Sequence, residues 1–155
     1  MNIFMPKYKF SIYYALNFGI ISAIAPILIF QGATGKGWDI LWIYTGTGSM
    51  ITAFLFAWYF IERPKKFNHL RLILIAILVG IFSHWLSWYE IMVVDYIQWK
   101  FSGPHLAGTP SNPINGLYGA ALMAILSLIF MGWTAIPFSI GSIYLSKLMY
   151  VKPDN

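Results

Sequence analysis

Residues 72–89 read LILIAILVGIFSHWLSWY, a run that contains no Asp, Glu, Lys or Arg. A run this long and apolar is typical of a membrane-spanning helix, because about 20 apolar residues cross about 30 Å of hydrocarbon. A strand of a membrane barrel would alternate between apolar and polar side chains, and LILIAILVGIF shows no such alternation. The run therefore predicts an all-α integral membrane protein.

The composition of the 155-residue chain indicates the same class. Hydrophobic residues make up 59% of the chain and charged residues only 10%, whereas a soluble domain carries about 25% charged residues. Cysteine is absent, so the chain itself can form no disulfide, iron–sulfur cluster or thiolate metal site. The net charge of +5 is explained by the membrane topology described below, so no nucleic-acid partner is expected.

Other stretches without acidic or basic residues predict further membrane crossings at 10–35, 40–61 and 101–146. The last of these begins with FSGPHLAGTPSNPING, in which Pro, Gly, Ser and Asn disfavour a helix, so its membrane part is expected to start near Gly116. We therefore expect a single domain, residues 1–155, that consists of four transmembrane helices. Their expected positions are about 8–30, 40–61, 70–98 and 116–147.

The positions of the basic residues predict the orientation of these helices. With both termini in the cytoplasm, eight of the ten Lys and Arg residues lie on the cytoplasmic side, and only Lys36 and Lys100 lie outside. The 62–71 connection is then a hairpin on the cytoplasmic side. The expected location of the protein is the plasma or cytoplasmic membrane. The basic residues of the hairpin would attract anionic lipid headgroups at about 1 kcal/mol per charge. These residues are Arg63, Lys65, Lys66 and Arg71.

Tryptophan and tyrosine residues are expected to anchor the chain at the two membrane surfaces, where their amphipathic rings prefer to lie. The expected inner belt consists of Tyr8, Tyr13, Tyr14, Trp58, Tyr59 and Tyr150. The expected outer belt consists of Trp38, Trp42, Tyr44, Trp85, Trp88, Tyr89, Tyr96 and Trp99.

Small residues spaced by four predict the faces through which the helices pack. These faces are Ala15, Gly19 and Ala23; then Thr45, Ser49, Ala53 and Ala57; then Gly116, Ala120 and Ala124. Asn17 is expected to form a hydrogen bond to a neighbouring helix, because an unsatisfied amide is costly in lipid.

His84 is the only ionisable residue well inside a predicted span, and intramembrane ionisable groups are costly and often functional. One interpretation is structural: a hydrogen bond to a neighbouring helix. The other is functional: His84 binds a haem, a chlorophyll-type pigment or a metal ion, or belongs to a proton path. A metal site would recruit Glu90, Asp95 or His105, although no two of these have the i, i+4 spacing of a chelating pair. Either way the imidazole should face protein, because hydrocarbon offers no hydrogen bonds.

No Ser/His/Asp set, phosphate loop or paired-carboxylate motif is present, so the support for an enzyme is slight. The polar-poor core, a third helix longer than the hydrocarbon is thick, and the Pro-rich outer loop at 99–115 favour an accessory or structural subunit of a larger membrane complex. Such a subunit would contact the lipid bilayer and other membrane subunits. Two alternatives remain open: a cofactor-binding subunit of a membrane oxidoreductase that uses His84, and a small channel, carrier or immunity-type protein.

Overall fold

The computed structural model describes residues 9–29, 40–103 and 109–151, and the regular structure in these ranges is helical. The described part contains four α-helices, and a short π-helix that continues the second of them. They are α1 (Lys9–Ile29), α2 (Leu41–Ala57), η2 (Trp58–Glu62), α3 (His69–Ser102) and α4 (Pro113–Val151). The all-α class and the four helices expected from the hydropathy pattern are therefore confirmed.

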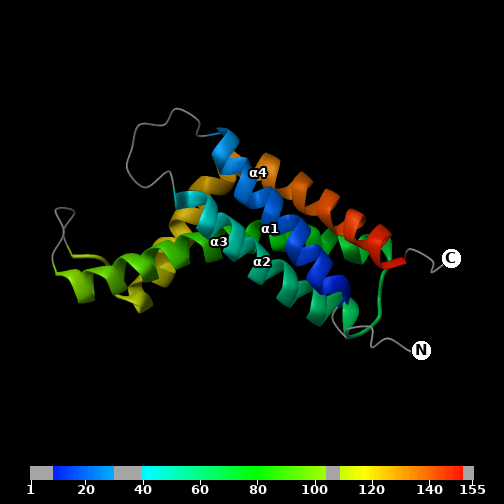
Figure 1. Cartoon of the computed structure of the whole chain (residues 1–155), viewed down its shortest axis with the longest axis horizontal. Helices are drawn as coiled ribbons and strands as arrows, with labels where there is room; N and C mark the ends of the chain where they lie inside the picture. The colour runs from blue at the N-terminus through cyan, green and yellow to red at the C-terminus, as the bar shows by residue number, and fades with distance from the viewer. Residues whose placement is uncertain (1–8, 30–39, 104–108, 152–155) are drawn as a thin grey trace.

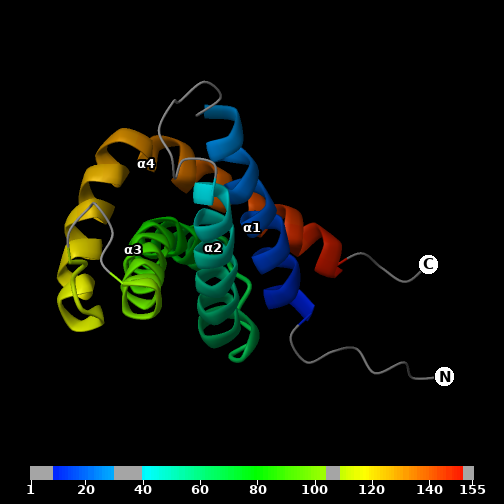
Figure 2. The same cartoon turned by 60° about the vertical axis from the view of Figure 1, so that its left-hand side comes forward.

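Each helix packs against the next one along the chain, and α4 also packs against α1, which closes the set into a bundle. The start of α1, the turn between η2 and α3, and the end of α4 lie together at one end of this bundle (Figure 1). At that end the Lys147 ammonium group donates a hydrogen bond to the Phe67 carbonyl oxygen, at 3.3 Å. Figure 2 shows that α4 changes direction along its length, with its first half beside α3 and its second half passing α1.

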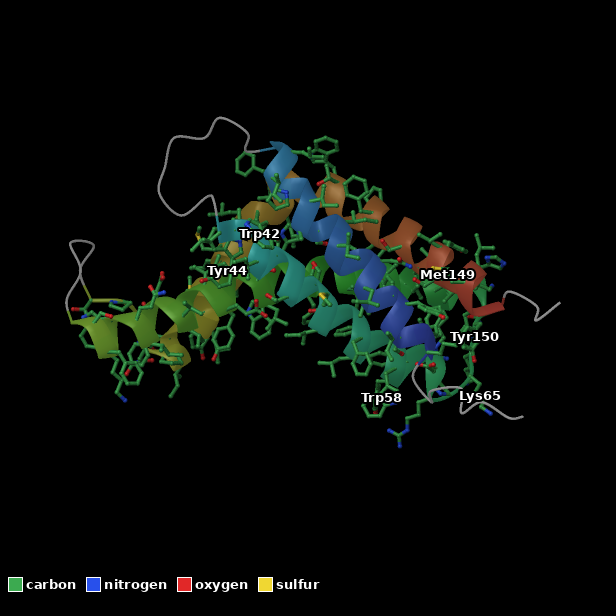
Figure 3. All side chains as sticks on the ribbon, in the orientation of Figure 1. Trp42, Tyr44, Trp58, Lys65, Met149 and Tyr150 are labelled. Atoms are coloured by element: carbon green, nitrogen blue, oxygen red, sulfur yellow. The ribbon has the colours of Figure 1, made fainter. Side chains whose placement is uncertain are left out.

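Three of the described helices, α1, α3 and α4, are long and apolar enough to cross a membrane. The helices α3 and α4, with 34 and 39 residues, exceed the length that a single crossing needs. Trp58 and Tyr150 lie at the same end of the bundle as Lys65, whereas Trp42 and Tyr44 lie toward the other end of α2 (Figure 3). This distribution fits two aromatic belts.

Polar caps set the ends of α3 and α4 at positions that differ from those expected. The side chain of Asn68 accepts a hydrogen bond from the Arg71 amide (3.1 Å) at the start of α3. Helix α3 ends at Ser102 and is followed by Gly103, whose φ of 80° suits glycine. Asn112 caps the Asn115 amide (2.9 Å) directly before Pro113, the first residue of α4. The loop expected at 99–115 is therefore shorter, because residues 99–102 belong to α3 and 113–115 to α4.

The π-helical turn η2 brings Glu62 to the start of α1. In this turn the Arg63 amide donates to the Trp58 carbonyl oxygen, five residues back, at 2.9 Å. The Glu62 carboxylate accepts hydrogen bonds from the amides of Phe10 (3.0 Å) and Ser11 (3.1 Å) and from the Ser11 hydroxyl. No acidic residue lies in the first turn of α1 itself, so Glu62 supplies the negative charge that a helix N-terminus favours.

A chain of buried hydroxyl groups joins α1, α4 and α3 near the end of the bundle where α1 starts. The Ser139 hydroxyl donates to the Ala76 carbonyl oxygen (2.8 Å), so the Tyr14 hydroxyl, 2.5 Å away, donates to Ser139. Tyr14 is 0% exposed, and its interpretation as a surface anchor was therefore wrong. The expectation for Asn17 is confirmed, because its amide donates to the Ser146 hydroxyl on α4 at 2.9 Å.

The small-residue faces are largely buried, as expected. Gly19, Ala53, Ala57, Gly116 and Ala120 are all buried in the bundle. Close approach of the backbones also involves glycines outside the predicted stripes, at Gly46, Gly48 and Gly80.

Candidate functional site: a cavity between the four helices

A cavity of about 470 Å³ lies between α1, α2, α3 and α4. This volume falls in the range of natural sites for small molecules, about 300–1,000 Å³. Aromatic and aliphatic side chains form most of the wall, including Phe18 from α1, Trp88 from α3 and Phe130 from α4. The polar groups of the lining residues are serine and threonine hydroxyls, the imidazole of His84 and the indole N–H of Trp88.

Short side chains on the inward faces of the helices leave this space open. On α2 these are Thr45 and Ser49, one turn apart, and on α3 they are Ser83 and Ser87, also one turn apart. Serine and threonine side chains are too short to fill the centre of a four-helix bundle. The facing helices therefore leave a void between them. The larger side chains of α1 and α4 complete its wall.

His84 lies on the wall of the cavity and contacts protein, as its hydrogen-bonding groups predict. Its Nδ1 atom lies 3.0 Å from the Ser127 hydroxyl of α4, and that hydroxyl also lies 3.0 Å from the Ala124 carbonyl oxygen. Within the described ranges, Ser127 is the only hydrogen-bond partner of His84. The second ring nitrogen, Nε2, is thus unpaired there.

Most hydroxyl protons around the cavity are used within the protein. The Thr45 hydroxyl donates to the Ser22 carbonyl oxygen (2.9 Å), Ser83 to the Gly80 carbonyl (3.0 Å), and Ser87 to the Ser83 carbonyl (2.8 Å). Ser49 differs: it is only 3% exposed, and its hydroxyl makes no hydrogen bond to any residue that the structure describes. The hydroxyl of the half-buried Ser22 also makes no hydrogen bond to any described residue.

The structure does not bring the acidic residues of the predicted metal site to His84 in the cavity. Glu90 accepts a hydrogen bond from the Thr47 hydroxyl of α2 (2.6 Å), and Asp95 is exposed on α3. His105 lies outside the described residues. Over residues 9–29, 40–103 and 109–151 there is no group of three or more His, Asp or Glu side chains that could hold a metal ion. The metal set of His84, Glu90, Asp95 and His105 stays a prediction.

The basic residues of the predicted lipid-headgroup site lie in and beside the turn after η2. Arg63, Lys65 and Lys66 are exposed and Arg71 is half-buried. The Arg63 guanidinium lies over the ring of Tyr59, 5.7 Å from its centroid. The exposed members are free to reach headgroups, which leaves this site as a prediction compatible with the structure.

The sequence pattern singled out His84 but not its partner. Ser127 is one of several serines in an apolar segment, and only the packing of α4 on α3 distinguishes it. Comparison of the chain with models of protein families, with curated protein sequences and with solved structures gives no match.

Proposed function

We propose that this chain is a multi-pass membrane protein that holds one small, mainly apolar molecule between its helices, with His84 as the polar anchor. The observation that supports this function best is the imidazole of His84 on the wall of a cavity of about 470 Å³. An ionisable residue inside a membrane span is costly and is typically functional. The earlier hypothesis of a cofactor at His84 is one form of this function.

The test is to purify the whole chain in a mild detergent and to analyse what accompanies it. Mass spectrometry of a solvent extract, metal analysis and visible absorbance should find one molecule per chain. Ser49→Phe should occupy part of the cavity and displace that molecule. The matched control is Gly141→Phe, because Gly141 is exposed and a Cβ there meets nothing within 4 Å. A folded wild-type chain that neither carries such a molecule nor binds one when it is supplied would contradict the proposal.

The proposed topology has four membrane crossings, with the N-terminus and the C-terminus in the cytoplasm. The proposed location is the plasma or cytoplasmic membrane. Helix α2 (17 residues) and η2 (5 residues) form one continuous segment from Leu41 to Glu62, long enough for a crossing. An even number of crossings also fits the common end shared by α1, the η2–α3 turn and α4 (Figure 1). The exposed basic residues of that turn favour the cytoplasmic side.

Cysteine labelling tests this orientation cleanly, because the native chain has no cysteine. A cysteine at Lys65 should be protected from an impermeant maleimide in intact cells and become labelled after permeabilisation. The control is a cysteine at Ser111, an exposed position in the loop between α3 and α4, which should be labelled in intact cells. Labelling of the Lys65 variant in intact cells would reverse the proposed orientation.

A second candidate function is that of an accessory subunit, and the outer tip of the α3–α4 pair favours it. Large apolar side chains are exposed there: Ile97 (47%), Phe101 (84%), Ile114 (72%) and Tyr118 (76%). Because α3 is longer than one crossing needs, we expect its last turns to reach past the hydrocarbon, where exposed apolar side chains favour a protein partner. A photo-crosslinker at Phe101 should then trap another membrane chain in the same purification. Crosslinks to lipid alone would count against this role.

A further inference from the structure

The described wall of the cavity carries no charge. Its residues include no Asp, Glu, Lys or Arg, and His84 is its only titratable side chain. A buried ionic group without a partner is strongly disfavoured in a low-dielectric site. The phosphate of a charged lipid or the propionates of a haem would find no cation here, so an uncharged ligand fits the cavity better.

His84 offers this ligand a hydrogen-bond acceptor. The Ser127 hydroxyl has one proton, and we assign it to the Ala124 carbonyl oxygen, which can only accept and lies 3.0 Å away. The hydrogen bond between Ser127 and His84 Nδ1 then needs the proton of Nδ1. A neutral imidazole with its proton on Nδ1 has a free lone pair on Nε2.

Ser49 offers a hydrogen-bond donor. It lines the cavity, is 3% exposed, and has no partner among the residues that the structure describes. The Ser49 hydroxyl keeps access to the cavity, and a ligand oxygen that accepts its proton would give it the partner that the protein does not. The cavity thus presents an unpaired acceptor at His84 and two unpaired hydroxyl groups, at Ser49 and Ser22, of which Ser49 is the more deeply buried.

We infer that the cavity binds an uncharged long-chain alcohol, whose hydroxyl donates to His84 Nε2 and accepts from the Ser49 hydroxyl. A single hydroxyl group is both donor and acceptor, so it matches both groups, and an acyl or isoprenoid chain matches the apolar wall. This inference rests on the proposed function, because it names the chemical class of the molecule that the cavity holds.

Binding of tritiated farnesol, an isoprenoid alcohol, tests this class directly. The whole chain is placed in phosphatidylcholine nanodiscs, and saturable binding is measured above that of protein-free discs. Farnesyl methyl ether and farnesyl phosphate compete as unlabelled ligands. The ether keeps an acceptor oxygen but has no proton to donate. In the wild-type chain farnesol should bind about fivefold more tightly than the ether, the effect of one net hydrogen bond, and the phosphate should not compete.

Two variants assign the hydrogen bonds. His84→Leu should weaken farnesol binding about fivefold and abolish the preference for farnesol over the ether. Ser49→Ala should weaken both ligands equally, also about fivefold, because both retain an acceptor oxygen. Ser111→Ala, at an exposed serine in the loop before α4, is the matched control and should bind like the wild type.

The comparison of the three ligands in the wild-type chain needs no substitution. It therefore tests the inference even if a variant fails to fold. Equal affinity for farnesol and its ether, or competition by the phosphate, would overturn the inference. A co-purifying molecule that lacks a hydroxyl group would overturn the chemical class alone and leave the proposed function standing. A chain that purifies empty and binds none of the three ligands would overturn both.

Discussion

Replacing Gly48 by alanine is expected to lower the thermal unfolding midpoint of the purified chain by several degrees. Gly48 lies on α2 against α3, and a Cβ there would lie 2.5 Å from the Ser87 hydroxyl oxygen, 3.0 Å from the Ser87 amide nitrogen and 3.2 Å from its Cα. The hydroxyl can rotate away, but the backbone of α3 cannot, so the two helices must separate. Overpacking of this kind costs about 1–3 kcal/mol.

Two alanine variants at other helical glycines separate this contact from the effect of adding a methyl group. Gly141→Ala should leave stability unchanged or raise it slightly, because nothing lies within 4 Å of a Cβ there and alanine favours a helix. Gly19→Ala should also destabilise the chain, because a Cβ there would lie 1.9 Å from Met50 Cγ and 3.3 Å from the Gly46 carbonyl oxygen, so the Met50 side chain must change its rotamer. A Gly48→Ala variant as stable as Gly141→Ala would contradict the close α2–α3 contact.

The helices were predictable because a membrane imposes a simple constraint. In lipid each backbone polar group needs an internal partner, so an apolar run such as 72–89 has few options besides a helix. The same reasoning predicted that His84 and Asn17 would face protein, since each carries polar groups that hydrocarbon cannot satisfy. Both contact serines on α4 in the structure. These predictions depended on single residues and not on their partners.

The cavity and the helix ends could not be predicted in this way. Ser22, Ser49 and Ser127 are ordinary serines in sequence, and only the rotation of each helix in the bundle turns them toward one space. Tyr14 carries the amphipathic ring of an interfacial anchor, yet a hydroxyl acceptor at Ser139 allows its complete burial. Contacts between residues far apart in the chain decided each of these outcomes.

The second large effect is expected for Glu62→Ala, which should lower the free energy of unfolding by about 2 kcal/mol. Its carboxylate accepts from the Phe10 and Ser11 amides and from the Ser11 hydroxyl. Loss of an N-terminal cap costs about 0.5–2 kcal/mol, and hydrogen bonds to charged groups contribute about 1.5–3 kcal/mol. The matched control is Asp95→Ala, because Asp95 is exposed on α3 and should tolerate the change. Thermal unfolding of the two variants, measured in the same detergent, gives the difference.

A double-mutant cycle with Ser11 shows whether this loss comes from the contact with α1. Ser11→Ala removes only the hydroxyl bond, so it should cost less than Glu62→Ala in the wild-type chain and almost nothing in the Glu62→Ala chain. Hydrogen exchange should quicken at the Phe10 and Ser11 amides in the Glu62→Ala variant, because these amides lose their acceptor. If Glu62→Ala is no less stable than Asp95→Ala, or if the two substitutions are additive, η2 does not hold α1 through this carboxylate.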